Sequence, residues 1–145
     1  MGGQMVSHAF ELDRRLAEDT VAVTDWTLSR LLLMNDRRYP WLILVPRRAG
    51  MVEAFDLDEA DRALLWRETN AVAAALKTMT GCRKINIGAL GNVVSQLHVH
   101  VVARREGDAA WPGPVWGKGA AEPYSGDEAA ALVERFKVML RDAAV

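Results

Sequence analysis

Within residues 95–104, Ser-Gln-Leu-His-Val-His-Val-Val-Ala-Arg, polar and apolar side chains alternate from Gln96 to Val101, a pattern that indicates a β-strand. Successive side chains of an extended strand point to opposite faces of a sheet. We therefore expect a strand over Val93–Ala103, with Gln96, His98 and His100 on one face. The other face, which we assign to the core, carries Leu97, Val99, Val101 and Ala103. A strand of this kind needs a sheet and a layer that covers its apolar side.

Two apolar runs nearer the N-terminus predict an antiparallel hairpin. Leu28–Met34 stops at the turn residues Asn35 and Asp36, and Trp41–Val45 stops at Pro46. Two such runs joined by a polar turn are typical of paired strands. The remaining short elements that we expect before residue 90 are a helix over Phe10–Asp19 and strands over Val21–Val23 and Lys84–Gly88.

Two amphipathic helices are expected to cover the sheet. The longer one begins at Asp56, with Glu59 at the reciprocal capping position, and stops at Gly81. Its apolar residues follow helical spacing and indicate a buried stripe, namely Leu57, Leu64, Leu65, Val72, Leu76 and Met79. The second helix opens at Ser125 with Glu128 as its capping partner, after a loop over 105–124 rich in glycine and proline. This order of elements favours an α+β fold with an antiparallel sheet.

Composition limits the classes of partner. A chain of 145 residues can build one domain with its own core, and its formal net charge of −1 provides no general attraction to nucleic acid or to an anionic membrane. Any phosphate binding must therefore be local. The single cysteine, Cys82, cannot form an intrachain disulfide, and the first residues contain neither a basic leader nor a long apolar run. We expect a cytoplasmic protein.

The two histidines of the alternating segment suggest phosphoryl chemistry. Same-face side chains on a strand lie about 6.5 to 7 Å apart, a spacing suited to gripping successive oxygens of a phosphoryl group. A neutral imidazole is a nucleophile, so attack by His98 on an α-phosphorus would give a covalent nucleotidyl intermediate. We expect His100 and Gln96 to hydrogen-bond to phosphate oxygens or to the leaving group.

A metal site is the natural rival, because His-x-His on a strand is a common ligand pair. The chain has only three histidines, of which His8 lies in the tail, and it has no Asp or Glu between Glu68 and Glu106. We therefore expect no metal site and no required cofactor, although Mg²⁺ could accompany a polyphosphate substrate. We assign most of the tryptophans to the core or to a dimer contact.

The string Gln96-Leu-His-Val-His-Val-Val102 resembles the signature of the histidine triad (HIT) superfamily, His-φ-His-φ-His-φ-φ, where φ is apolar. The central and third histidines correspond to His98 and His100, and Gln96 stands where the first would be. The resemblance implies that His98 is the nucleophile. It also implies a five-stranded antiparallel sheet with one long helix and a C-terminal helix, assembled as a two-fold homodimer. We divide the chain into a flexible tail over 1–9, a catalytic domain over 10–115, and a loop and helix over 116–145 packed on that domain.

The resemblance also implies binding residues. In the family the hairpin turn carries a residue that grips the ribose, a role that falls to Asn35 or Asp36. The strand and turn that contact phosphate correspond to 84–92, where Asn86, Gly91 and Asn92 are the matching residues. Val93 stands where the family often has Ser or Thr.

The function implied is hydrolysis or transfer at a phosphoanhydride or phosphoramidate bond of a purine nucleoside 5′-phosphate derivative. Substrates of this kind are dinucleoside polyphosphates and nucleoside phosphoramidates. Two alternatives stay open. One is a noncatalytic nucleotide-binding module in which Gln96 and Val93 mark the loss of chemistry. The other is a metal-dependent hydrolase, which predicts stoichiometric zinc or iron in the purified protein.

Overall fold

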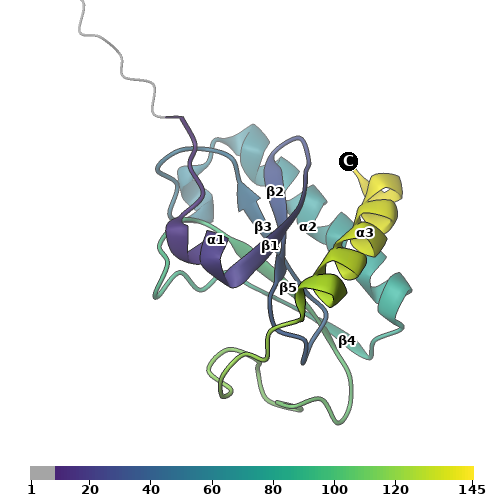
Figure 1. Ribbon diagram of the computed structural model, residues 1–145. Coiled ribbons are helices and arrows are strands. Elements are labelled where there is room, and N and C mark those ends of the chain that lie inside the picture. Colours follow the sequence, from purple (N-terminus) through teal and green to yellow (C-terminus); the bar gives the residue numbers. More distant parts are fainter. Residues whose placement is uncertain (1–8) are drawn as a thin grey trace, which may run out of the picture.

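The strands form one antiparallel sheet in the order β1-β2-β3-β5-β4, seen in a computed structural model that describes residues 9–145 (Figure 1). The strands are β1 Thr20–Asp25, β2 Ser29–Met34, β3 Trp41–Pro46, β4 Lys84–Gly88 and β5 Val99–Arg104. The predicted hairpin is confirmed as β2 and β3, in which Leu32 lies opposite Ile43. The predicted five-stranded α+β fold is confirmed as well.

The predicted strand over Val93–Ala103 is too long at its start. Strand β5 begins at Val99, and residues 93–98 have irregular structure. The pairing of β3 with β5 ends at Leu44, opposite Val99, and Pro46 two residues later has no backbone N–H to extend the ladder. The backbone N–H of Leu97 instead donates to the carbonyl of Met51 at 2.9 Å. His98 therefore lies just before the strand, and Gln96 lies in the preceding loop.

Each α-helix begins after a residue whose side chain caps its first turn. The helices are α1 Arg14–Asp19, the short 3₁₀ turn η1 Ala54–Asp56, α2 Glu59–Thr80 and α3 Gly126–Ala143. The predicted start of α2 at Asp56 is wrong, because Asp56 ends the η1 turn and its carboxylate accepts from the backbone N–H groups of Val52 and Glu53, which precede that turn. Asp58 is the actual cap and accepts from the backbone N–H of Asp61. Gly81 ends α2 in a left-handed conformation, with φ of 64°. The capping box of Ser125 and Glu128 opens α3 as predicted.

The two faces of the sheet are covered differently. Helices α2 and α3 pack against each other and against one face (Figure 1). The core on that face includes the four apolar residues predicted for it, Leu97, Val99, Val101 and Ala103. The opposite face is covered by α1 and by the loop that follows β5, whose Ala110 and Val115 are buried against Trp41 and Val102.

A buried ion pair holds this loop in place. The Arg104 side chain is 2% exposed, and its guanidinium donates to both carboxylate oxygens of Asp108 at 2.8 and 2.9 Å. It also donates to Oδ1 of Asn86 and to the carbonyl of Gly113, each at 2.8 Å. Arg104 of β5 therefore binds the loop at two positions, Asp108 and Gly113.

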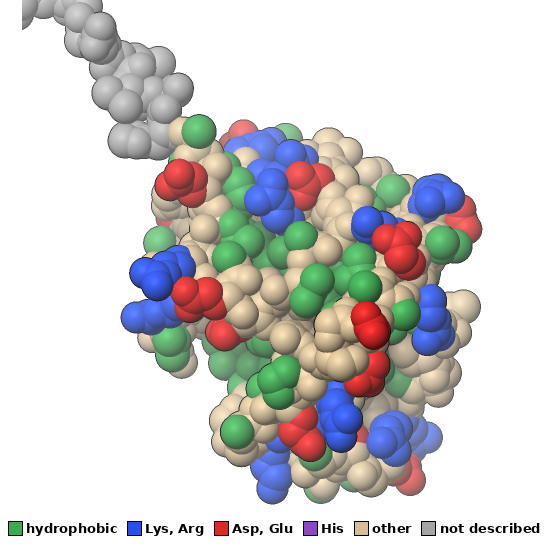
Figure 2. Space-filling model, in the orientation of Figure 1, with side chains coloured by type: hydrophobic (Ala, Val, Ile, Leu, Met, Phe, Trp, Pro, Cys, Tyr) green, Lys and Arg blue, Asp and Glu red, His purple; other side chains and the backbone are tan. Residues whose placement is uncertain are grey.

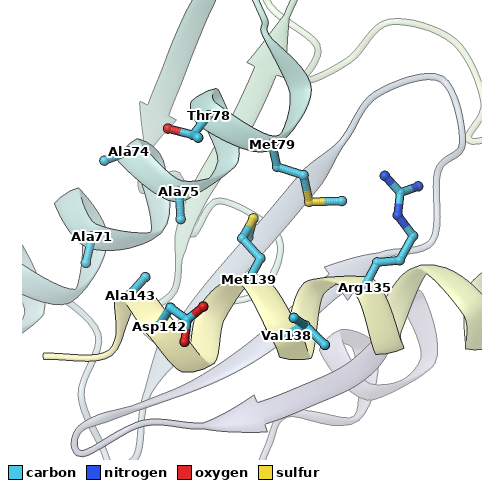
Figure 3. A pocket seen from close by; sticks show the side chains of 10 residues that line it. All are labelled: Ala71, Ala74, Ala75, Thr78, Met79, Arg135, Val138, Met139, Asp142 and Ala143. Carbon is cyan, nitrogen blue, oxygen red and sulfur yellow. The ribbon is translucent and has the colours of Figure 1, made fainter.

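On the face of the molecule shown in Figure 2, acidic and basic side chains are interspersed among apolar ones. Within residues 9–145, no helix combines the length and the apolar character needed to cross a membrane.

Candidate active site

A cavity of about 770 Å³ lies on the face of the sheet covered by α1 and the long loop. His98 and His100 line it, and the two side chains are 7% and 5% exposed. Its walls come from α1, from the turn after β2, from residues 90–94 and from residues 115–123. These segments thus surround His98, just before β5, and His100 within it.

The backbone selects the tautomer of His98. Nδ1 of His98 lies 2.7 Å from the carbonyl oxygen of Gln96. A carbonyl can only accept a hydrogen bond, so Nδ1 must carry the proton. In the neutral ring Nε2 then has a free lone pair, which is the state that a nucleophilic imidazole needs.

A tryptophan selects the opposite tautomer of His100. Nε1 of Trp41 lies 3.0 Å from Nδ1 of His100. An indole N–H can only donate, so Nδ1 of His100 accepts and the ring proton sits on Nε2. Burial, with a smaller effect from His98, lowers the pKa of His100 from its ordinary value of 6.5 to about 3. His100 is therefore a neutral hydrogen-bond donor at pH 7.

Aromatic rings hold the two imidazoles in place. The rings of His98 and His100 meet edge to face, with centroids 4.9 Å apart. Trp41 and Trp116 contact His100 from other sides, each at 5.5 Å between ring centroids. Such contacts restrict ring rotation, so the nucleophile and the donor are ordered before any ligand binds.

The sequence pattern at these two tryptophans does not indicate that they belong to the site. Trp41 follows a turn and opens an apolar strand, a pattern that indicates a core position, and it is indeed buried. Trp116 lies in the irregular loop, where no periodicity reports its direction. The sequence also does not indicate that Leu16, Glu18 and Asp19 of α1 line the cavity, because contacts between segments distant in the sequence leave no local signal.

Both candidate ribose residues line the cavity. Asp36 is 2% exposed, and its carboxylate is held by the guanidinium of Arg38 at 2.8 Å. Burial acts to raise the pKa of Asp36, but the hydrogen bonds from Arg38 and from the backbone of Glu122 outweigh it, and the pKa lies below its ordinary value. Oδ1 of Asn35 accepts from the backbone N–H of Tyr124 at 2.9 Å.

The other predicted residues separate into two groups. Gly91 and Asn92 line the cavity, with Gly91 in a left-handed conformation at φ of 72°. Gln96 and Asn86 are not among the cavity-lining residues. The Asn86 side chain accepts from Arg104, and both polar atoms of the Gln96 amide bond to the backbone of the segment before α1. The expectation that Gln96 shares a strand face with the histidines is wrong, because the strand starts after it.

Within residues 9–145, no group of three or more His, Cys, Asp or Glu side chains is arranged to hold a metal ion. The two imidazoles have their Nδ1 atoms engaged by a carbonyl and an indole. The arrangement therefore offers one nucleophilic nitrogen and one neutral hydrogen-bond donor, both lining the same cavity.

Comparisons with known proteins identify the family to which this fold belongs. A histidine triad (HIT) protein from Sinorhizobium meliloti 1021 is 55% identical, with a TM-score of 0.86 over 91% of this chain and 96% of that chain. A histidine triad protein from Marinobacter aquaeolei VT8 is 40% identical, with a TM-score of 0.91 over 94% of this chain and 100% of that chain.

A more distant structure, Plasmodium falciparum diadenosine triphosphate hydrolase in complex with Cyclomarin A, is 16% identical. Its TM-score is 0.62 over 96% of this chain and 88% of that chain, which shows a shared fold alone. A search of curated proteins gives no match. The HIT domain matches residues 15–107, more than half of the sequence. This chain therefore belongs to the HIT domain family.

Proposed function

We propose that this protein is a nucleotide hydrolase or transferase that works through a covalent nucleotidyl-His98 intermediate. It would cleave a phosphoanhydride or phosphoramidate bond of a nucleoside 5′-phosphate derivative. The observation that carries the proposal is the hydrogen bond between Nδ1 of His98 and the Gln96 carbonyl, because it leaves Nε2 with a free lone pair.

The proposed reaction has two steps. Nε2 of His98 attacks the α-phosphorus, a P–N bond forms, and the P–O or P–N bond to the leaving group breaks with its electron pair; an amine leaving group takes up a proton from solvent as it departs. Water, or another acceptor in a transfer reaction, then attacks the same phosphorus and loses a proton to solvent, and the bond to His98 breaks to release the nucleoside monophosphate. Splitting one displacement into two lowers each barrier.

His100 would stabilise charge in both steps. Its Nε2–H donates to a nonbridging phosphate oxygen or to the leaving group, where negative charge grows in the transition state. Its low pKa, about 3, keeps it a neutral donor across the physiological range. Gly91 and Asn92, which line the cavity, would add backbone N–H groups toward the same phosphate.

The cavity also suits a nucleotide in size and polarity. Its volume of about 770 Å³ lies within the range usual for small-molecule sites. Asn35 and Asp36 would face the ribose, and a purine base is the expected neighbour of the apolar wall that includes Leu16. Among solved structures with this fold, the protein from P. falciparum is a diadenosine triphosphate hydrolase, a name that fits one of the two substrate classes.

The proposed covalent step needs no metal, since the nucleophile and the donor are side chains. Mg²⁺ would enter only with a polyphosphate substrate, bound to its phosphates. We propose in addition a two-fold homodimer. Trp66 on α2 is 62% exposed and Ile87 on the edge strand β4 is 40% exposed, and burying such residues would stabilise an assembly. A monomeric mass by light scattering at micromolar concentration would contradict the dimer.

Turnover of three substrates tests the function: adenosine phosphoramidate, diadenosine tetraphosphate and adenylyl sulfate. We expect at least one to be hydrolysed, His98→Ala to abolish that activity, and His100→Ala to reduce it while leaving it measurable. Thermal unfolding of both variants controls for folding. Near wild-type activity in His98→Ala would contradict the assignment of the nucleophile. Nucleotide binding without any turnover would favour the noncatalytic module.

A further inference from the structure

Gln96 connects the segment before α1 to the loop that carries the nucleophile. Its Oε1 accepts from the backbone N–H of Asp13 and its Nε2 donates to the carbonyl of Glu11, both at 2.8 Å. These contacts span more than 80 positions in the sequence. A single side chain thus satisfies one donor and one acceptor of the irregular segment before α1, which a primary amide can do because it carries both groups.

The anchored segment leads directly into a wall of the cavity. The Asp13 side chain caps α1 by accepting from the backbone N–H of Arg15 at 2.8 Å. Leu16, Glu18 and Asp19, which follow in α1, line the same cavity as the two histidines. Nη1 of Arg15 also reaches the carbonyl of Val93 at 3.1 Å, so α1 is tied twice to the loop before β5.

The backbone of Gln96 meanwhile serves the nucleophile. Its carbonyl accepts from Nδ1 of His98, and the next N–H, that of Leu97, donates to the carbonyl of Met51 at 2.9 Å. The peptide unit between residues 96 and 97 is therefore held from both sides, whatever side chain stands at position 96. The Gln96 side chain connects this peptide unit to the segment before α1 through its hydrogen bonds to Asp13 and Glu11.

We propose that Gln96 is a positioning residue that sets the α1 wall of the nucleotide cavity relative to His98. The proposal rests on the function proposed above. The Gln96 side chain does not line the cavity, so its effect reaches the substrate only through Leu16, Glu18 and Asp19. Replacing it should weaken nucleotide binding, while the chemical step, which depends on the backbone carbonyl of Gln96, should change little.

Gln96→Met removes both side-chain hydrogen bonds at nearly constant length. One net hydrogen bond corresponds to roughly a fivefold effect, so we expect KM for the best substrate to rise about five- to tenfold. We expect kcat to stay within about twofold, because the hydrogen bond that orients His98 comes from the backbone. If the Gln96 side chain contacted the reacting phosphate, its removal would lower kcat instead.

Asp13 offers a matched pair that tests the link from its other end. Asp13→Pro removes the N–H that Gln96 accepts from, and the φ of −53° at this position suits proline. Asp13→Ala keeps that N–H. Both variants lose the side-chain cap of α1, so their difference isolates the backbone donor. Because Asp13→Pro and Gln96→Met break the same bond, their effects on KM should be less than additive.

Hydrogen exchange without nucleotide gives a readout that does not depend on activity. We expect the α1 amides to exchange faster in Gln96→Met than in the wild-type protein. We also expect them to exchange faster in Asp13→Pro than in its matched control, Asp13→Ala. Unchanged exchange in Gln96→Met, additive effects in the double variant, or a fall in kcat at constant KM would each overturn the positioning role. Absence of turnover in the wild-type protein would contradict the proposed function alone, and exchange would then decide the role of Gln96.

Discussion

Nε1 of Trp41 donates a hydrogen bond of 3.0 Å to Nδ1 of His100, and this contact places the His100 proton on Nε2. The carbonyl of Gln96 has the opposite effect on His98, whose proton it holds on Nδ1. Two histidines of identical chemistry are thereby given different states, one ready to attack and the other ready to donate. The division follows from one backbone acceptor and one indole donor.

Trp41→Phe tests the first of these contacts. Phenylalanine keeps most of the ring packing but cannot donate, so the proton of His100 is no longer confined to Nε2. We expect a fall of about tenfold in the single-turnover rate, a change of roughly 1.4 kcal/mol in the barrier. Imidazole ¹⁵N shifts should show mixed tautomers of His100. Trp116→Phe is the matched control, because Trp116 contacts the same ring without donating to it and should leave the tautomer unchanged.

The depressed pKa of His100 predicts how stability depends on pH. The unfolded chain takes up a proton at this residue near pH 6.5, whereas the folded protein does so only near pH 3. Between these values the unfolded state binds more protons, so the free energy of unfolding falls as the pH is lowered. One such group contributes a slope of up to about 1.4 kcal/mol per pH unit.

Chemical denaturation between about pH 7 and pH 4 measures that slope. His100→Gln removes the titrating group, and we expect its free energy of unfolding to depend less steeply on pH than that of the wild type. Identical slopes for the two proteins would show that His100 has an ordinary pKa in the folded state.

The buried pair of Arg104 and Asp108 should be costly to break. Asp108→Asn leaves the Arg104 guanidinium buried without its carboxylate, and a loss of about 3 to 5 kcal/mol in the free energy of unfolding is expected for such a change. Glu106→Gln is the control, since the pair of Arg83 and Glu106 is 70% exposed on both sides and contributes little. Equal effects of the two substitutions would contradict the role given to the buried pair.

The absence of a side chain at Gly88 leaves room for the indole of Trp116. A Cβ at Gly88 would lie 3.1 Å from Cη2 of Trp116, so Gly88→Ala must shift the indole that borders the cavity. We expect a loss of roughly 1 kcal/mol in stability and a higher KM. Gly126→Ala is the matched control, because nothing lies within 4 Å of a Cβ at that position. A KM in Gly88→Ala equal to that of the control would show that Trp116 does not shape the site.

The sequence predicted the order of the strands and helices because their signals are local, although the helix expected over Phe10–Asp19 begins only at Arg14, after its cap Asp13. Alternation at Leu97, Val99 and Val101 and the stop at Gly81 depend on neighbouring residues only. The start of β5 was misplaced because it depends on where β3 ends and on the distant acceptor Met51.

The site was predicted less completely for the same physical reason. His98 and His100 carry their chemistry in their residue type, but the partners that set their tautomers are a backbone carbonyl and a side chain from another strand. Gln96 looked like a phosphate ligand because its amide could serve that purpose. Its actual partners, Glu11 and Asp13, are adjacent to it only in the folded protein.

Direct detection of the covalent intermediate tests the central claim. The wild-type protein would be mixed with excess adenosine phosphoramidate or diadenosine tetraphosphate, quenched in alkali on the millisecond timescale, digested and examined by mass spectrometry. We predict one adenylyl group on the peptide that contains His98, formed before product appears, and no such group in His98→Ala. Turnover with no adenylyl group on His98 at any time, or an adenylyl group on His100, would contradict the account.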